Sequence, residues 1–245
     1  GYRFSAIILH DNMQLRSYLQ NALHLFYPHL CCGCGSDILP ENEMLCIKCI
    51  AHLPFTQFES IEGNSIEKIF YGRVKIESAY SLLYFSRHQL VQQLIHQFKY
   101  GGNKKLGEFL GQIMGYAMQK SKRFAAVEIL VPLPLHAEKV FKRGFNQAEI
   151  LCKGMQQVTG LPIADTISVT REKYTETQTK KHRVERWQNV EDSFAVHNPG
   201  LLQNKHVLIV DDVITTGATL EACATAMQHI EAVTISIATL AIASK

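Results

Sequence analysis

Two apolar runs in the last third of the 245-residue chain constrain its fold most. The runs VLIV at 207–210 and ISIATLAI at 235–242 do not alternate apolar with polar residues. Strands that are covered on both faces have this pattern, because helices flank both sides of a parallel sheet. We therefore predict an α/β protein with a parallel sheet and flanking helices. Further predicted elements in this half are a strand within 127–135, a helix near 146–158, and strand candidates near Ile167 and Phe194.

Periodic patterns extend the prediction toward the amino terminus. Residues 79–85 read as a strand. Apolar side chains recur with a helical period over 90–98 and 106–117, on either side of Gly101-Gly102, so we predict two successive helices. Another amphipathic helix is predicted from Asp11 to Phe26.

Composition excludes several classes of protein. The chain is 47% hydrophobic, with 25 Lys and Arg against 22 Asp and Glu, a net charge of +3. Such a small excess does not indicate a polyanionic partner, so any face that binds nucleic acid must be a local cluster. No apolar run approaches the ~18 residues that span a bilayer, and the first residues lack a signal peptide's basic region and cleavage site. We expect a cytoplasmic protein without a membrane span.

Cysteines are concentrated in one short segment. Cys31 and Cys34 form one CxxC pair, and Cys46 and Cys49 form a second, eleven residues further on. Two such turns can bring four thiolates into the tetrahedral shell that Zn²⁺ prefers, and a closed shell of this kind is structural. Cys32 could replace Cys31 as a ligand. A disulfide would require an oxidising compartment, which nothing in the sequence indicates.

A polar stretch, residues 59–68, follows the cysteine segment and contains Gly63, Asn64 and Ser65. Polar segments with turn residues often join domains. We therefore place a small amino-terminal zinc-knuckle module at 1–70 and the larger α/β domain at 71–245.

The segment HVLIVDDVITTGAT, residues 206–219, combines a buried strand, two carboxylates and a turn that opens a helix. Ligands of parallel sheets bind at the carboxyl ends of strands, where Asp211 and Asp212 fall. Two adjacent carboxylates need compensation, which a ribose diol or a magnesium ion could supply. Backbone amides at a helix amino terminus favour a phosphate. These amides belong to Thr215, Thr216, Gly217, Ala218 and Thr219. Helix capping alone would not require this whole set.

This arrangement closely resembles the phosphoribosyl pyrophosphate (PRPP) motif of type I phosphoribosyltransferases. The resemblance implies that Asp211 and Asp212 bind the ribose hydroxyls and that residues 215–219 bind the 5′-phosphate. A pyrophosphate loop, the family's second element, resembles Pro132-Leu133-Pro134-Leu135, followed by Lys139, Lys142, Arg143 and Gly144. Cations there would neutralise the diphosphate together with Mg²⁺. A polar segment at 171–189 has the position of the family's catalytic lid.

Taken together, several segments resemble the ComF family of competence-associated proteins, in order from about Cys31 to Ile237. They are the two CxxC pairs, LIHQFKYGGNKKLGEFLG, VPLPLHAEKVFKRGFNQAE, TQTKKHRVERWQNV and VLIVDDVITTGATLEAC. The resemblance implies a zinc knuckle joined to a type I phosphoribosyltransferase-like domain, a PRPP site, and a role in the uptake of single-stranded DNA. It also implies other competence or recombination proteins as partners.

Two functions remain open at this point. The first is a DNA-handling protein that binds PRPP as a ligand or regulator. The second is an enzyme that transfers ribose 5-phosphate from PRPP to a nucleobase or amine, as amidophosphoribosyltransferases do. Basic residues near aromatic rings favour the first function, because basic grooves with aromatic side chains suit single-stranded DNA. They are Lys99, Lys104, Lys105, Lys139–Arg143, Lys180, Lys181, Arg183 and Arg186, beside Phe98, Tyr100, Phe141, Phe145 and Trp187.

Overall fold

The structure, a computed structural model, describes residues 30–37, 39, 43–85, 89–165, 168–172 and 193–243. The chain divides into two compact units, residues 1–52 and 53–245. The helix predicted at 11–26 and residues 173–189 of the predicted lid lie outside the described residues.

In the first unit, two cysteine-bearing turns face each other. The first turn is closed by the amide of Cys31, which donates to the Ser36 carbonyl at 2.8 Å. The second turn leads directly into the short helix α2 (Ile47–Ala51), which begins after Cys46. Met44 and Leu45 are buried.

The second unit is built on a four-stranded sheet in the order β1-β6-β5-β2, with every neighbouring pair parallel. Its strands are β1 (Ala79–Phe85), β2 (Ile129–Pro132), β5 (His206–Ile214) and β6 (Thr234–Ala243). Val207 to Val210 are fully buried, as expected for a strand that is covered on both faces. The predicted parallel sheet is confirmed.

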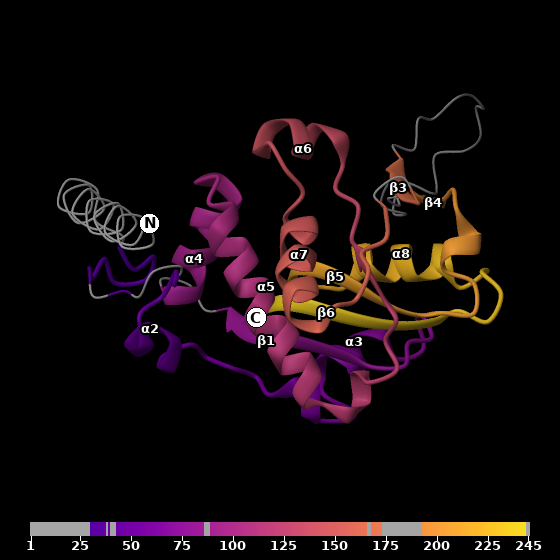
Figure 1. Cartoon of the computed structure of the whole chain (residues 1–245). Helices are drawn as coiled ribbons and strands as arrows, with labels where there is room; N and C mark the ends of the chain where they lie inside the picture. Colours follow the sequence, from indigo (N-terminus) through magenta and orange to yellow (C-terminus); the bar gives the residue numbers. More distant parts are fainter. Residues whose placement is uncertain are drawn as a thin grey trace, which may run out of the picture. The chain divides into compact units, whose positions relative to one another are not determined.

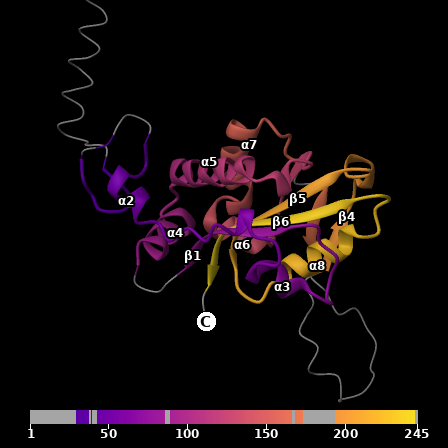
Figure 2. The same cartoon turned by 90° about the horizontal axis from the view of Figure 1, so that it is seen from below.

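Helices cover both faces of the sheet (Figures 1 and 2). On one face lie α4 (Leu90–Tyr100), α5 (Lys104–Lys120) and α7 (Gln147–Thr159), and on the other lie α3 (Ser65–Phe70) and α8 (Ala218–Met227). Short 3-10 turns are η1 (Phe58–Ser60), η2 (Lys122–Phe124) and η3 (Pro199–Leu201). Backbones of α5 and α7 approach so closely that a Cβ on Gly154 would lie 2.0 Å from the Glu108 carbonyl oxygen.

Helix α6 (Ala137–Arg143) follows the end of β2 and has no buried residue. Figure 1 shows it projecting from the body of the unit. The sequence analysis predicted no helix among these basic residues, because the segment lacks an apolar stripe long enough to indicate one.

The two strand candidates near Ile167 and Phe194 do form strands, but they do not join the parallel sheet. β3 (Val169–Glu172) and β4 (Ser193–Val196) form a separate antiparallel pair, with Val169 opposite Val196. They flank the undescribed segment 173–192. Each of these strands has only four residues. So short a segment does not show in the sequence which sheet it joins.

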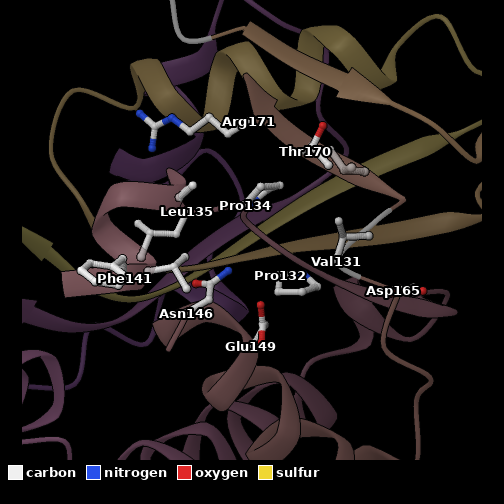
Figure 3. A pocket seen from close by; sticks show the side chains of 13 residues that line it. Val131, Pro132, Pro134, Leu135, Phe141, Asn146, Glu149, Asp165, Thr170 and Arg171 are labelled. Atoms are coloured by element: carbon white, nitrogen blue, oxygen red, sulfur yellow. The ribbon is translucent and has the colours of Figure 1, made fainter. Parts of the chain in front are cut away.

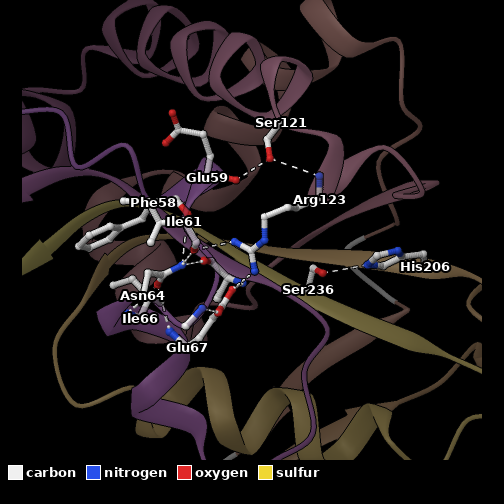
Figure 4. Close-up of polar contacts among 12 residues, drawn as sticks. Phe58, Glu59, Ile61, Asn64, Ile66, Glu67, Ser121, Arg123, His206 and Ser236 are labelled. Atoms are coloured by element: carbon white, nitrogen blue, oxygen red, sulfur yellow. Dashed lines mark hydrogen bonds and ion pairs between the residues drawn. The ribbon is translucent and has the colours of Figure 1, made fainter.

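The unit boundary lies between His52 and Leu53, whereas we predicted it at residue 70. Segment 53–70 packs on β1, and Figure 4 shows why. The Asn64 side chain donates to the carbonyls of Phe58, Ile61 and Ala79. A carboxylate oxygen of Glu67 accepts from the Ala79 amide at 3.0 Å. Two of the polar residues in the stretch that suggested a linker, Asn64 and Glu67, are therefore buried and hydrogen-bonded.

Among the described helices, none is both long enough and apolar enough to span a bilayer.

Candidate functional site

The four cysteines of the two CxxC pairs meet at one point of the first unit. The sulfurs of Cys31, Cys34, Cys46 and Cys49 all lie within 4.8 Å of one another. The Cys34 and Cys46 sulfurs are 3.7 Å apart. A tetrahedral shell with zinc–sulfur bonds of about 2.3 Å would separate its sulfurs by about 3.8 Å. The cluster therefore fits a metal ion such as zinc, and it contains Cys31 rather than Cys32.

Backbone amides support thiolates at this cluster. The amides of Cys46 and Gly33 donate to the Cys31 sulfur at 3.2 and 3.4 Å. Burial alone would raise the pKa of Cys31, but amides from Cys46, Cys34 and Gly33 bring that pKa down to about 6. Burial and the neighbouring thiols raise the pKa of Cys49 above its ordinary value. Thiolates packed this closely repel one another, and a bound cation would offset the repulsion.

The second unit carries the motif singled out in the sequence at the carboxyl end of β5. The strand continues past both aspartates, because Asp211 pairs in register with Thr239 and Ile214 with Ile242. Asp211 and Asp212 therefore lie inside the last part of the strand, whereas the sequence predicted them at its end. The Asp212 amide donates to Asp211 Oδ1 at 2.8 Å.

The two aspartates have different electrostatic surroundings. Burial, and then the charge of Asp212, raises the pKa of Asp211 to about 7, while Lys99 and Arg171 oppose the increase. Asp212 is only 8% exposed and forms an ion pair with Lys99, whose Nζ lies 2.8 Å from Asp212 Oδ2. The pair thus carries less negative charge than two free carboxylates.

The loop after β5 turns into α8 at Gly217, which has φ = 77°. Thr215, Thr216 and Ala218 are exposed, and Thr219 is half-buried in the first turn of α8. Their amides stand at the amino end of a ten-residue helix, where the helix dipole favours an anion.

Residues outside the motif support this loop, and no pattern in the sequence pointed to them. The Arg73 guanidinium donates to the Thr216 carbonyl at 3.0 Å and forms an ion pair with Glu221 of α8. A Cβ on Gly217 would lie 2.6 Å from Ile69 Cγ2, so α3 packs directly against the turn. Only the spatial arrangement reveals these contacts, because they are more than 140 residues distant in sequence.

The end of β2 lies beside the motif. Pro132 pairs with Val210, and the amide of Leu133 donates to the Val210 carbonyl at 2.9 Å, one residue before Asp211. The Leu133 carbonyl accepts from Asn146 Nδ2 at 3.0 Å, which ties the loop to the start of α7. The structure therefore brings the predicted pyrophosphate loop and the aspartates to the same edge of the sheet.

Arg143, at the end of α6, is held from two sides. Its Nη1 donates to Gln147 Oε1 at 2.8 Å, and its guanidinium carbon lies 5.7 Å from the centre of the Tyr100 ring. Tyr100 is the last residue of α4, next to Lys99. Arg143 and Asp212 thus both contact the end of one helix.

A cavity of about 620 Å³ lies between the loop after β2, α6 and β3 (Figure 3). Its residues are Val131, Pro132, Pro134, Leu135, Ala137, Val140, Phe141, Asn146, Glu149, Asp165, Val169, Thr170 and Arg171. Of the predicted pyrophosphate loop, it includes Pro132, Pro134 and Leu135. The cavity therefore adjoins the predicted site but does not contain its aspartates.

Comparisons with known proteins agree with this architecture. The phosphoribosyl transferase domain family matches residues 140–245. The chain is 27% identical to competence protein F of Haemophilus influenzae over 81% of this chain and 83% of that protein. It is 28% identical to the DNA utilization protein YhgH of Salmonella typhimurium over 59% of this chain and 63% of that protein, less than two thirds of its length.

Among solved structures, the chain is similar to a hypoxanthine phosphoribosyltransferase from Staphylococcus aureus. The identity is 17%, with 74% of this chain and 73% of that chain covered, and the TM-score is 0.32. This likeness is too weak to bear on function.

A parallel sheet with the β5–α8 motif and a matching domain family defines a phosphoribosyltransferase-type domain, here preceded by a four-cysteine module. The similarity to competence protein F extends over most of the chain. The chain is a homologue of competence protein F and of DNA utilization proteins.

Proposed function

We propose that the second unit binds PRPP at the shared carboxyl edge of β5 and β2. The observation that carries this proposal is the hydrogen bond between the Leu133 amide and the Val210 carbonyl, because it holds the loop after β2 against the strand that bears both aspartates. In open parallel sheets, ligands bind at this edge.

Each part of PRPP has a candidate partner in this proposal. Asp211 and Asp212 accept hydrogen bonds from the ribose diol, and the amides and hydroxyls of residues 215–219 bind the 5′-phosphate. Pro132, Leu133 and Arg143 border the diphosphate, which would enter together with Mg²⁺. Of these three, Arg143 supplies the positive charge.

Calorimetric titration of PRPP with Mg²⁺ tests the assignment. The double variant Asp211→Asn/Asp212→Asn should lose binding while the fold persists, since both changes keep the side-chain shape. A matched control is Asp37→Asn, at an exposed aspartate of the first unit. Unchanged affinity in the double variant would refute the site.

We further propose that the same domain handles single-stranded DNA during DNA uptake. Support comes from aromatic and basic residues on α6 and at the turn between α4 and α5: Tyr100, Lys104, Lys139, Phe141, Lys142 and Arg143. Phe141 is 93% exposed and Tyr100 is 61% exposed. Exposed rings among cations suit single strands, because bases stack on the rings while the cations bind phosphates.

Fluorescence anisotropy with a labelled oligonucleotide tests this surface. Phe141→Ala should weaken binding about tenfold, since stacking contributes about 1–3 kcal/mol per base. Tyr116→Ala, at an exposed ring near the far end of α5, serves as the control. Affinity should fall steeply with added salt because phosphate contacts release counterions. A flat salt response would contradict direct DNA binding.

Pyrophosphate release separates the DNA-handling function from an active transferase. PRPP and Mg²⁺ would be incubated with nucleobases, ammonia, glutamine or single-stranded DNA. We expect bound PRPP without release, as for a ligand or regulator. Release that requires one acceptor and both aspartates would instead establish pentosyl transfer.

For the first unit, we propose that the four-cysteine cluster holds structural Zn²⁺. Support comes from the 3.7 Å distance between the Cys34 and Cys46 sulfurs and from the absence of an open position in a shell of four thiolates.

A further inference from the structure

The carboxyl end of α4 contacts both halves of the proposed PRPP site. Lys99 reaches Asp212 on β5, and the next residue, Tyr100, lies under Arg143 at the end of α6. α4 ends immediately afterwards at Gly101. Two adjacent residues of one helix thus touch the predicted ribose side and the predicted diphosphate side.

The ion pair between Lys99 and Asp212 is mostly buried. The side chains are 17% and 11% exposed, and the Nζ–Oδ2 distance is 2.8 Å. An ion pair in this position has a desolvation cost that an apolar pair would avoid, so its retention suggests a role beyond stability. It fixes one carboxylate oxygen of Asp212, while the Asp212 amide donates to Asp211 Oδ1.

Tyr100 has a comparable relation to Arg143. The guanidinium stacks over the Tyr100 ring at 5.7 Å and is also bound by Gln147 at 2.8 Å. An arginine at the end of a helix with no buried residue would otherwise sample many rotamers. The ring and the glutamine together restrict it to one place.

We propose that the end of α4 is a third wall of the site, in which Lys99 positions Asp212 for a ribose diol and Tyr100 positions Arg143 for a diphosphate. Both are positioning residues that act through the side chains they contact. This inference rests on the proposed PRPP-binding function and adds two residues that the PRPP motif does not include.

The two contacts act on different parts of the ligand, and this separates them by experiment. Ribose 5-phosphate has the diol and the 5′-phosphate but no diphosphate, whereas pyrophosphate has only the diphosphate. Replacing Lys99 should therefore lower the affinity for ribose 5-phosphate, and replacing Tyr100 should lower the affinity for pyrophosphate. PRPP has both parts and should respond to either change.

Calorimetry on the full chain with PRPP, ribose 5-phosphate and pyrophosphate, each with Mg²⁺, tests the proposal. Lys99→Met should lower the affinity for ribose 5-phosphate and for PRPP about tenfold, the scale of a charge-assisted hydrogen bond. Its affinity for pyrophosphate should not change. Tyr100→Leu should lower the affinity for pyrophosphate and for PRPP about threefold, the scale of an exposed cation–π contact. Its affinity for ribose 5-phosphate should not change. Lys99→Arg should restore most of the ribose 5-phosphate affinity, because it keeps the positive charge.

Two control variants match the size and chemistry of these changes. Lys120→Met and Tyr116→Leu alter exposed residues toward the other end of α5 and should change no affinity. A variant that merely unfolds loses all three ligands, so the affinity that each variant retains reports an intact fold.

The positioning roles of Lys99 and Tyr100 would be refuted if either variant lost the same affinity for ribose 5-phosphate as for pyrophosphate, or if neither variant lost affinity. PRPP binding by the natural chain would still stand in that case. If the natural chain binds none of the three ligands, the PRPP site and this inference both fall.

Discussion

Gly217 has two separate structural requirements. Its φ of 77° is in the left-handed region, where a Cβ costs about 1 kcal/mol. In addition, a Cβ would lie 2.6 Å from Ile69 Cγ2 and 3.3 Å from a Phe70 ring carbon. Gly217→Ala should therefore lower the free energy of unfolding by about 2–4 kcal/mol, since overpacking adds about 1–3 kcal/mol to the backbone strain. Urea denaturation measures this change.

Gly160→Ala is the matched control for that substitution. Gly160 has φ = 71° at the end of α7, and a Cβ there meets nothing within 4 Å. Its cost should be backbone strain alone, about 1 kcal/mol. Equal costs at Gly160 and Gly217 would show that α3 does not press against the loop at residues 215–219.

Asp211 should make stability depend on pH. Burial raises its pKa to about 7 in the folded chain, against about 3.9 when unfolded. Between these values the folded state binds more protons than the unfolded state, so stability falls as the pH rises from about 4 to about 7, by at most about 1.4 kcal/mol per unit. Above pH 7 the loss ends, because both states are ionised.

Comparing the natural chain with Asp211→Asn isolates this effect. The asparagine does not titrate, so the difference between their unfolding free energies should grow from pH 4 to pH 7 in favour of the variant. A constant difference across this range would mean that Asp211 is ionised throughout.

Among the elements, α3 depends on the buried amide of Asn64. Its Oδ1 accepts from the amides of Ile66 and Glu67, and its Nδ2 donates to three carbonyls. Asn64→Asp keeps the shape but turns a carboxylate oxygen toward those three carbonyls. We expect a loss of about 3 kcal/mol or more in the free energy of unfolding, because the donors disappear and a charge becomes buried.

Asn198→Asp, at an exposed position, is the control and should cost under about 0.5 kcal/mol. PRPP affinity at the proposed site should also fall in Asn64→Asp, because Ile69 and Phe70 of α3 lie against Gly217 in the loop at residues 215–219. If stability is unchanged, the amide network of Figure 4 contributes little to the fold.

Elements with a strong pattern were predictable from sequence, and those that depend on distant contacts were not. The strand at 79–85 matches β1, and the helix near 146–158 matches α7, because apolar spacing fixed both. Asn64 and Glu67 suggested a linker, since composition does not reveal that a polar side chain is buried against backbone groups. Likewise, the PRPP motif is visible as a string of residues, whereas Arg73 and Lys99 join it only through the fold.

At the scale of the whole chain, the two units have separate sources of stability. Residues 53–245 have an apolar core around a parallel sheet, while the described part of the first unit gathers four cysteines at one point. If the cluster holds zinc as proposed, metal binding contributes folding free energy to this unit. Loss of the metal should therefore affect the first unit selectively.

Cys46→Ser with Cys49→Ser tests this independence. The double variant should lose its bound zinc, as measured by atomic absorption, because two thiolates of the shell are missing. Cys32→Ser should keep the metal, since Cys32 lies outside the cluster. Both variants should bind PRPP as the natural chain does, because the proposed site lies entirely in residues 53–245. Loss of PRPP binding together with zinc would mean that the first unit stabilises the second, and retention of zinc by the double variant would exclude the four-cysteine cluster as its site.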